Sequence, residues 1–232
     1  MNWKIWNICL AVIGGVFISI NAWAGGYKHF VEYQGKRLDF AYYVPESVTA
    51  KADAIILVPG LNGRGEQMID DKWMALSDKT GRPIIAPSFV FEGDAAFRKE
   101  KSYQYPKVWS GGALNAILDA FANKGIRIRY LYMAGFSAGA QFVGRYALAN
   151  PNQVAKCAIG AAGGNDPIDY RSPVKFFYAI GENEESNRRQ ISDIFMKQAA
   201  TYGVSVDRKI YPNVGHTYTA EMEDDFIRFL EK

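Results

Sequence analysis

The residues best suited to covalent chemistry lie in one segment, Leu131–Ala140, which reads LYMAGFSAGA. An apolar run typical of a β-strand ends at Gly135, and small residues typical of a helix follow Gly139. Strand, Gly-x-Ser-x-Gly and helix, in that order, predict a sharp and strained turn with Ser137 at its apex. Side chains in place of either glycine would collide with the crossing strand or helix. A serine presented in this way can act as a nucleophile, and the amide of Ala138 would face the group that it attacks.

The Gly-x-Ser-x-Gly pattern by itself is weak, because chance produces one in about one of ten chains of this length. Its simpler interpretation is a glycine-rich turn in which Ser137 only caps the following helix. A catalytic serine also needs a base within hydrogen-bond reach. The chain has two histidines. His29 lies in an expected hairpin, where a half-exposed structural histidine is the plain interpretation, whereas His216 lies between the last predicted strand and the last helix. His216 is therefore the predicted base.

Hydrophobic periodicity predicts which elements position these side chains. A hairpin is expected over 27–45, and later strands over 54–58, 83–90, the run before Ser137, 156–162, 174–180 and 204–211. Helices are expected over 66–79, around 114–121, after Ser137, over 186–202 and around 222–230. Strands that alternate with helices in this way predict an α/β fold: an eight-stranded, mostly parallel, doubly wound sheet with helices on both faces.

Ser137 in Gly-Phe-Ser-Ala-Gly, a later acid and His216 last give a chain order that resembles the α/β-hydrolase superfamily. The resemblance extends from Tyr27 to the C-terminus, and within the superfamily it is strongest to small, lidless secreted esterases of the feruloyl esterase and polyhydroxybutyrate depolymerase type. It implies an α/β-hydrolase fold with no large lid domain, and a serine hydrolase that cleaves carboxylic esters through an acyl-enzyme. The same residues could instead serve a peptidase, a thioesterase or an acyltransferase, or remain in an inactive binding protein of the same fold.

The resemblance also implies the third member of a catalytic triad, an acid after the seventh strand. Glu184 in the segment GENEE is the match, with glutamate in place of the commoner aspartate. Its role would be to hold the tautomer of His216 and to stabilise the imidazolium. Other nearby carboxylates remain alternatives: Glu182, Glu185, Asp166 and Asp169.

The oxyanion formed on attack needs preorganised donors. The resemblance implies two backbone amides, those of Ala138 and Leu61. Leu61 lies in Pro59-Gly60-Leu61, where the superfamily usually has His-Gly-x, so proline replaces a familiar histidine while the amide is kept.

Other reactive residue types have simpler interpretations. Ser110 is expected to cap a helix, and Cys157, in an apolar strand, is expected to be a buried and inert thiol. The acidic run 221–225 (EMEDD) is expected to be a solvated helix face rather than a metal site. Since the sequence has no His/Cys/carboxylate cluster with zinc spacing and no nucleotide-binding glycine loop, no metal and no cofactor is predicted.

The composition limits the classes of molecule that the protein is expected to bind. The chain has 232 residues, 49% of them hydrophobic, and a net charge of +3. Its basic residues are scattered without a long run or interleaved aromatics, which argues against nucleic-acid binding. The expected partner is a small-molecule or polymer-derived ester. The aromatic-rich connection 91–109 leaves the carboxyl end of a strand, so it is expected to overhang the site.

The first residues resemble an export signal. Lys4 precedes an apolar stretch over 5–20, and Ala22-Trp23-Ala24 fits a signal-peptidase site. We therefore predict a signal peptide over 1–24 with cleavage after Ala24, a catalytic domain over 25–232, a secreted or periplasmic location, and no stable membrane insertion after cleavage. An uncleaved anchor is the alternative, although the stretch is short for a membrane span. Cys9 would leave with the leader, so the mature chain could form no internal disulfide.

Overall fold

The computed structural model describes residues 27–89 and 102–232. The predicted signal peptide over 1–24 lies outside the described residues, and so does most of the connection 91–109 that was expected to overhang the site. The structural statements below concern the described residues.

A single sheet organises the fold, and it has the eight strands that the sequence predicts, in the order β1-β2-β4-β3-β5-β6-β7-β8. The pairs β1/β2 and β2/β4 are antiparallel, whereas every later pair is parallel. The sheet is therefore mostly parallel, as predicted. The strands are β1 (Tyr27–Tyr33), β2 (Lys36–Tyr43), β3 (Lys51–Val58), β4 (Ile84–Pro87), β5 (Arg127–Phe136), β6 (Val154–Gly160), β7 (Lys175–Gly181) and β8 (Val206–Tyr211).

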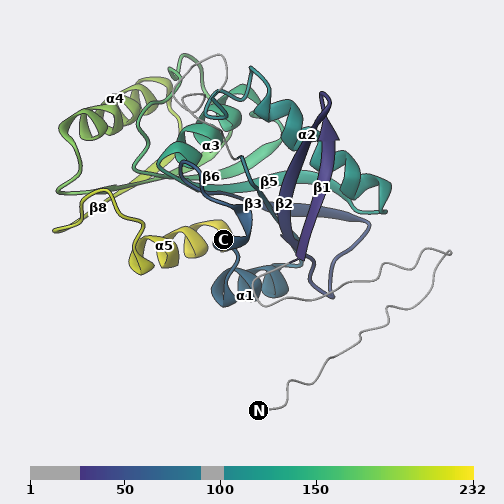
Figure 1. The fold of residues 1–232 in the computed structure, drawn as a ribbon. Coiled ribbons are helices and arrows are strands. Elements are labelled where there is room, and N and C mark those ends of the chain that lie inside the picture. Colours follow the sequence, from purple (N-terminus) through teal and green to yellow (C-terminus); the bar gives the residue numbers. More distant parts are fainter. Residues whose placement is uncertain (1–26, 90–101) are drawn as a thin grey trace, which may run out of the picture.

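Helices cover both faces of the sheet, which makes it doubly wound (Figure 1). The helical elements are η1 (Gly65–Met68), α1 (Asp71–Thr80), α2 (Ser110–Asn123), α3 (Ala138–Ala149), α4 (Ser186–Tyr202) and α5 (Ala220–Glu231). In Figure 1, α1 and α5 lie together on one side of the sheet, and α2, α3 and α4 lie on the other. None of the described helices is long and apolar enough to cross a membrane.

The two layers bury two hydrophobic clusters, one on each face. The larger cluster joins α2, α3 and α4 to the sheet and includes Phe142, Tyr146 and Phe195. The smaller cluster joins α1 and α5 and includes Trp73 and Phe226. Because the parallel strands are covered on both faces, their apolar runs are continuous rather than alternating.

Some boundaries differ from the sequence prediction. The helix expected over 66–79 is divided into η1 and α1, because the Asp70 side chain accepts hydrogen bonds from the amides of Lys72 and Trp73 and so starts a new helix. The strand expected over 83–90 is shorter and ends at Pro87. β3 begins at Lys51, three residues earlier than predicted, and pairs with β5 across a register shift.

Trp73 provides a test of the smaller cluster, since it is fully buried and its Nε1 donates to Glu223 at 3.1 Å. We expect Trp73→Ala to lower the free energy of unfolding by about 3–5 kcal/mol through lost apolar burial and an unfilled cavity. Urea denaturation measures this change. The control Ile194→Ala removes a side chain that is 49% exposed, and it should change the free energy of unfolding by no more than about 0.5 kcal/mol. Equal effects of the two substitutions would contradict the described packing.

Candidate active site

The turn between β5 and α3 has the strained geometry that its sequence predicts. Ser137 has φ 56° and ψ −114°, a backbone conformation that side-chain-bearing residues rarely adopt. Close packing leaves no room for side chains at the flanking glycines. A Cβ on Gly139 would lie 2.1 Å from the carbonyl oxygen of Val58, and a Cβ on Gly135 would lie 2.6 Å from the backbone of Gly139. The turn therefore projects Ser137 from the carboxyl edge of the sheet.

His216 lies beside this serine, on the loop between β8 and α5. Its Nε2 is 2.9 Å from the Oγ of Ser137, and its ring packs against Phe136 with the centroids 5.0 Å apart. The other histidine, His29, is exposed on edge strand β1 and packs against Phe40. Burial and the nearby Lys124 lower the pKa of His29.

Glu184 completes a continuous chain of contacts. Its Oε2 is 2.8 Å from the Nδ1 of His216, and its side chain has no exposed surface. A hydrogen bond from Nδ1–H to a carboxylate leaves the Nε2 of His216 unprotonated and able to accept the serine proton. The structure thus brings together the three side chains Ser137, His216 and Glu184.

The alternative carboxylates lie elsewhere or have other partners. Glu182 accepts a hydrogen bond from the backbone amide of Asn213, and Asp166 pairs with Arg145 at 3.1 Å. Glu185 has a side chain that is 68% exposed. Asp169 is exposed as well.

Backbone contacts set the distance between Glu184 and His216. The amide of Asn183 donates to the carbonyl of Val214 at 2.8 Å, which ties the turn after β7 to the loop that carries His216. Gly181 permits this approach, because a Cβ there would lie 2.2 Å from the Val214 oxygen. The spacing between the turn that carries Glu184 and the loop that carries His216 is therefore set by main-chain contacts and not by the side chains alone.

The two predicted oxyanion donors border Ser137. Ala138 is the first residue of α3, where an amide has no acceptor within its own helix. A Cβ on Gly60 would lie 3.8 Å from the Cβ of Ser137, so the loop that contains Leu61 runs beside the serine. The hydroxyl of Tyr103 donates to the carbonyl of Pro59 at 3.0 Å and holds this loop in place. This role of Tyr103 was not predicted, and its only sequence signal was an aromatic residue in a connection expected near the site.

Two other interpretations need correction. Ser110 does not cap α2: Trp109 is the N-cap, and the buried Ser110 hydroxyl donates to the carbonyl of Tyr103 at 2.7 Å, because the turns before α2 fold back onto its first residue. The acidic run over 221–225 is only partly a solvated face. Asp225 accepts hydrogen bonds from Lys209 and Tyr211, and Glu223 accepts one from Trp73.

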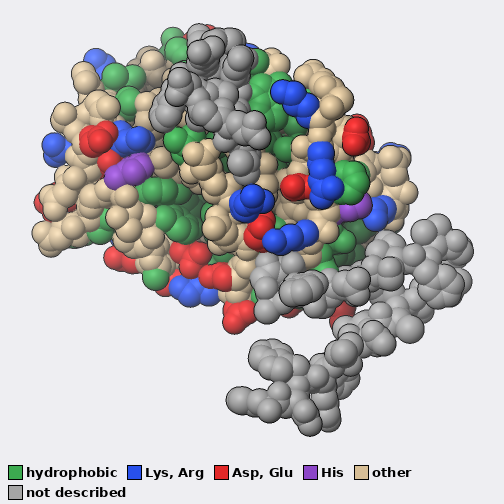
Figure 2. Space-filling view, viewed as in Figure 1, with side chains coloured by type: hydrophobic (Ala, Val, Ile, Leu, Met, Phe, Trp, Pro, Cys, Tyr) green, Lys and Arg blue, Asp and Glu red, His purple; other side chains and the backbone are tan. Residues whose placement is uncertain are grey.

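Cys157 is fully buried in β6, and burial raises the pKa of its thiol, as expected for an inert cysteine. No group of three or more His, Cys, Asp or Glu side chains that could hold a metal ion occurs within 27–89 and 102–232. On the face shown in Figure 2, acidic and basic side chains are interspersed.

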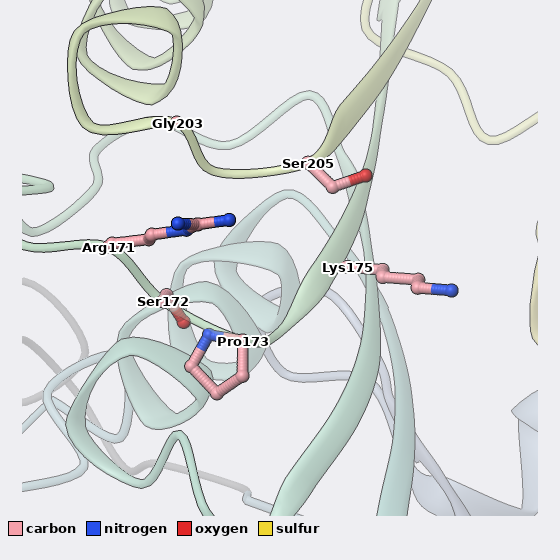
Figure 3. A pocket seen from close by; sticks show the side chains of 6 residues that line it. All are labelled: Arg171, Ser172, Pro173, Lys175, Gly203 and Ser205. Atoms are coloured by element: carbon pink, nitrogen blue, oxygen red, sulfur yellow. The ribbon is translucent and has the colours of Figure 1, made fainter.

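An open pocket of about 460 Å³ lies at the other edge of the sheet (Figure 3). Lys175, the first residue of β7, lines it, whereas Glu184 follows the last residue of that strand. Arg171 extends across the pocket near Gly203, which is the C-cap of α4. Cations are favourable near the negative end of a helix dipole, so these charges have a structural explanation. This pocket is separate from the site at Ser137.

Comparison with sequence profiles of known families gives no match, and comparison with curated proteins gives none either. Comparison with solved structures gives many. A ferulic acid esterase from Anaeromyces mucronatus, solved with ferulic acid, has a TM-score of 0.70 at 13% identity, over 89% of each chain. Poly(aspartic acid) hydrolase-1 from Sphingomonas sp. KT-1 has a TM-score of 0.66 at 13% identity, over 90% of this chain and 99% of its own.

An S-formylglutathione hydrolase from Agrobacterium tumefaciens has a TM-score of 0.64 at 12% identity, over 92% of this chain and 95% of its own. These proteins share the sheet and its helical layers with the present chain along almost their whole lengths. Sequence identities this low support a shared fold but not a shared activity. The chain has the α/β-hydrolase fold.

Proposed function

We propose that this protein is a serine hydrolase that cleaves carboxylic esters through an acyl-enzyme intermediate. The observation that carries the proposal is the unbroken chain of contacts from Ser137 Oγ to His216 Nε2 at 2.9 Å, and from His216 Nδ1 to the buried Glu184 carboxylate at 2.8 Å. A nucleophile next to a base that a third group orients is the arrangement that activates serine. The similar esterase and hydrolase structures also support it.

In the proposed reaction, Ser137 Oγ attacks the ester carbonyl while His216 Nε2 takes the hydroxyl proton. The resulting oxyanion is held by the backbone amides of Leu61 and Ala138. Collapse breaks the bond to the alcohol oxygen, which leaves with the proton from His216. Water then attacks the acyl-serine, again with His216 as base, and releases the acid. Glu184 remains ionised throughout and stabilises the imidazolium.

The substrate proposed is a small-molecule or polymer-derived ester. His216 has a side chain that is 37% exposed, so the described part of the site is open rather than covered, which favours accessible esters over lipid at an interface. We also propose export to the periplasm or the medium after cleavage behind Ala24, on the basis of the leader sequence.

Ser137→Ala tests the nucleophile. We expect it to reduce kcat for p-nitrophenyl acetate by about 10⁶-fold, because the nucleophile that forms the proposed acyl-enzyme is lost. The thermal melting curve should be retained. Ser77→Ala is the control: it removes a buried hydroxyl in α1, on the opposite side of the sheet from α3, and should leave turnover unchanged.

A fluorophosphonate probe separates the enzyme from an inactive protein of the same fold. Mass spectrometry should find the adduct on Ser137 in the natural chain and find none in Ser137→Ala. Failure of the folded natural chain to react would favour a binding protein. A panel of aryl, aliphatic, thioester and peptide acyl donors then distinguishes an esterase from a thioesterase or a peptidase.

Glu184→Gln tests the acid. An amide cannot stabilise the imidazolium and permits the wrong tautomer of His216, so kcat should fall by about 10⁴-fold with KM nearly unchanged. The control Glu185→Gln changes the adjacent, exposed carboxylate and should leave kcat close to that of the natural chain. A loss for Asp166→Asn or Glu185→Gln as large as that for Glu184→Gln would assign the acid differently.

A further inference from the structure

We propose that Arg188 is a positioning residue of this site, which holds the Glu184 carboxylate against His216 and places a positive charge beside it. The inference rests on the proposed function. Arg188 lies in the first turn of α4, one helical turn after Glu184, and its Nε is 3.7 Å from the Glu184 Oε1. No contact of Arg188 with the nucleophile is needed, because it acts through the acid.

The burial of Glu184 creates the need for such a partner. Its side chain has no exposed surface, and a buried carboxylate without compensation is strongly destabilised in its charged form. Two of its contacts are already accounted for: Oε2 faces His216, and Oε1 accepts a hydrogen bond from the Glu185 amide at 3.0 Å at the start of α4. Both of these partners are neutral while His216 waits to accept a proton. Arg188 supplies the full positive charge.

Arg188 is itself held in place by the fold. Its Nη1 donates to the carbonyl of Ala161, just beyond β6, at 2.9 Å. Gly163 leaves room for the guanidinium, since a Cβ there would lie 2.9 Å from Nη1. The guanidinium therefore links the end of β6 to the acid-bearing turn after β7.

A purely structural role of Arg188 does not explain the position of its Nε atom. It is buried and has no hydrogen-bond acceptor among the described residues, yet it lies between two carboxylates, 3.7 Å from that of Glu184 and 3.5 Å from that of Glu185. An unsatisfied buried donor calls for an explanation, and the two nearby carboxylates supply an electrostatic one. Its placement is explained by the charge that it brings to Glu184.

Other charged and titratable groups surround the pair, and none of those in the described part of the chain replaces Arg188. Glu182 and Glu185 flank the acid, and both are exposed. Burial raises the pKa of Tyr178 to about 12, so this residue stays neutral at the pH of an ester assay. Arg208 pairs with Asp193 at 2.7 Å. Removal of Arg188 would therefore take a full positive charge away from the surroundings of Glu184 and His216.

The experiment compares the pH dependence of kcat/KM in three variants, after the natural chain has been shown to hydrolyse p-nitrophenyl acetate and Ser137→Ala has been shown to be inactive. Arg188→Met keeps the length of the side chain without its charge. It should move the acidic half-point of kcat/KM upward by about one pH unit, and lower kcat at neutral pH with KM unchanged. Arg188→Lys restores a charge, so it should return the half-point most of the way to its natural value.

Arg189→Met is the matched control, because Arg189 is the next residue of the same helix and is exposed. It should leave the half-point unchanged. If Arg188→Met does not fold, Gly163→Ala displaces the guanidinium without removing it and should move the half-point in the same direction. The proposal would be overturned if Arg188→Met, or Gly163→Ala in its place, had the same half-point as Arg189→Met. Equal shifts of the half-point in Arg188→Met and Arg188→Lys would also overturn it. Such a result would leave the hydrolase assignment, tested by Ser137→Ala, intact.

Discussion

The close approach of α3 to the end of β3 is the constraint on which the site depends. The carbonyls of Val58 and Pro59 lie where any side chain at Gly139 would have to be. This contact forces the chain to turn within one residue between β5 and α3, and Ser137 takes up the strain. Packing across the sheet balances that strain, since α3 is almost entirely buried along its length. A looser helix would let the turn relax and lower the serine toward the sheet.

A second close approach, between Gly181 and Val214, positions the acid and the histidine, just as the close approach at Gly139 positions the serine. Parallel strands end at a common edge, so β5, β7 and β8 deliver three side chains that are far apart in sequence to one place. The main-chain contacts then restrict the remaining freedom of the loops. The precision of such a site derives largely from backbone packing, which explains how similar architectures persist at 12–13% identity.

The architecture could be predicted from sequence because it follows from periodicity. Eight strands, the alternation with helices and the turn at Ser137 are all local patterns. The juxtaposition of Ser137 and His216 was also predictable, since only one histidine follows the last strand. Glu184 was preferred among five carboxylates only through the resemblance, which places the acid after the seventh strand, because charge alone does not reveal which side chain is buried. The ends of β3 and β4 were also predicted inaccurately, because the limits of a strand depend on the strands with which it pairs.

Contacts between distant segments could not be predicted from the sequence. Ser110 bonds to Tyr103 rather than capping its helix, and Asp225 accepts hydrogen bonds from Lys209 and Tyr211 of β8. Arg188 was missed for a different reason, since its four-residue spacing from Glu184 at a helix start is a signal that could have been noticed. The hydrogen bond from the Tyr103 hydroxyl to the carbonyl of Pro59 was likewise a contact between distant segments that local patterns do not reveal.

The burial of Cys157 has a practical consequence. Its sulfur lies in the middle of the sheet, on a strand paired on both sides, where no solvent reaches it. An alkylating reagent can reach the thiol only in molecules whose central strands have separated. The rate at which that reagent modifies Cys157 therefore reports how often the central strands of the folded protein separate.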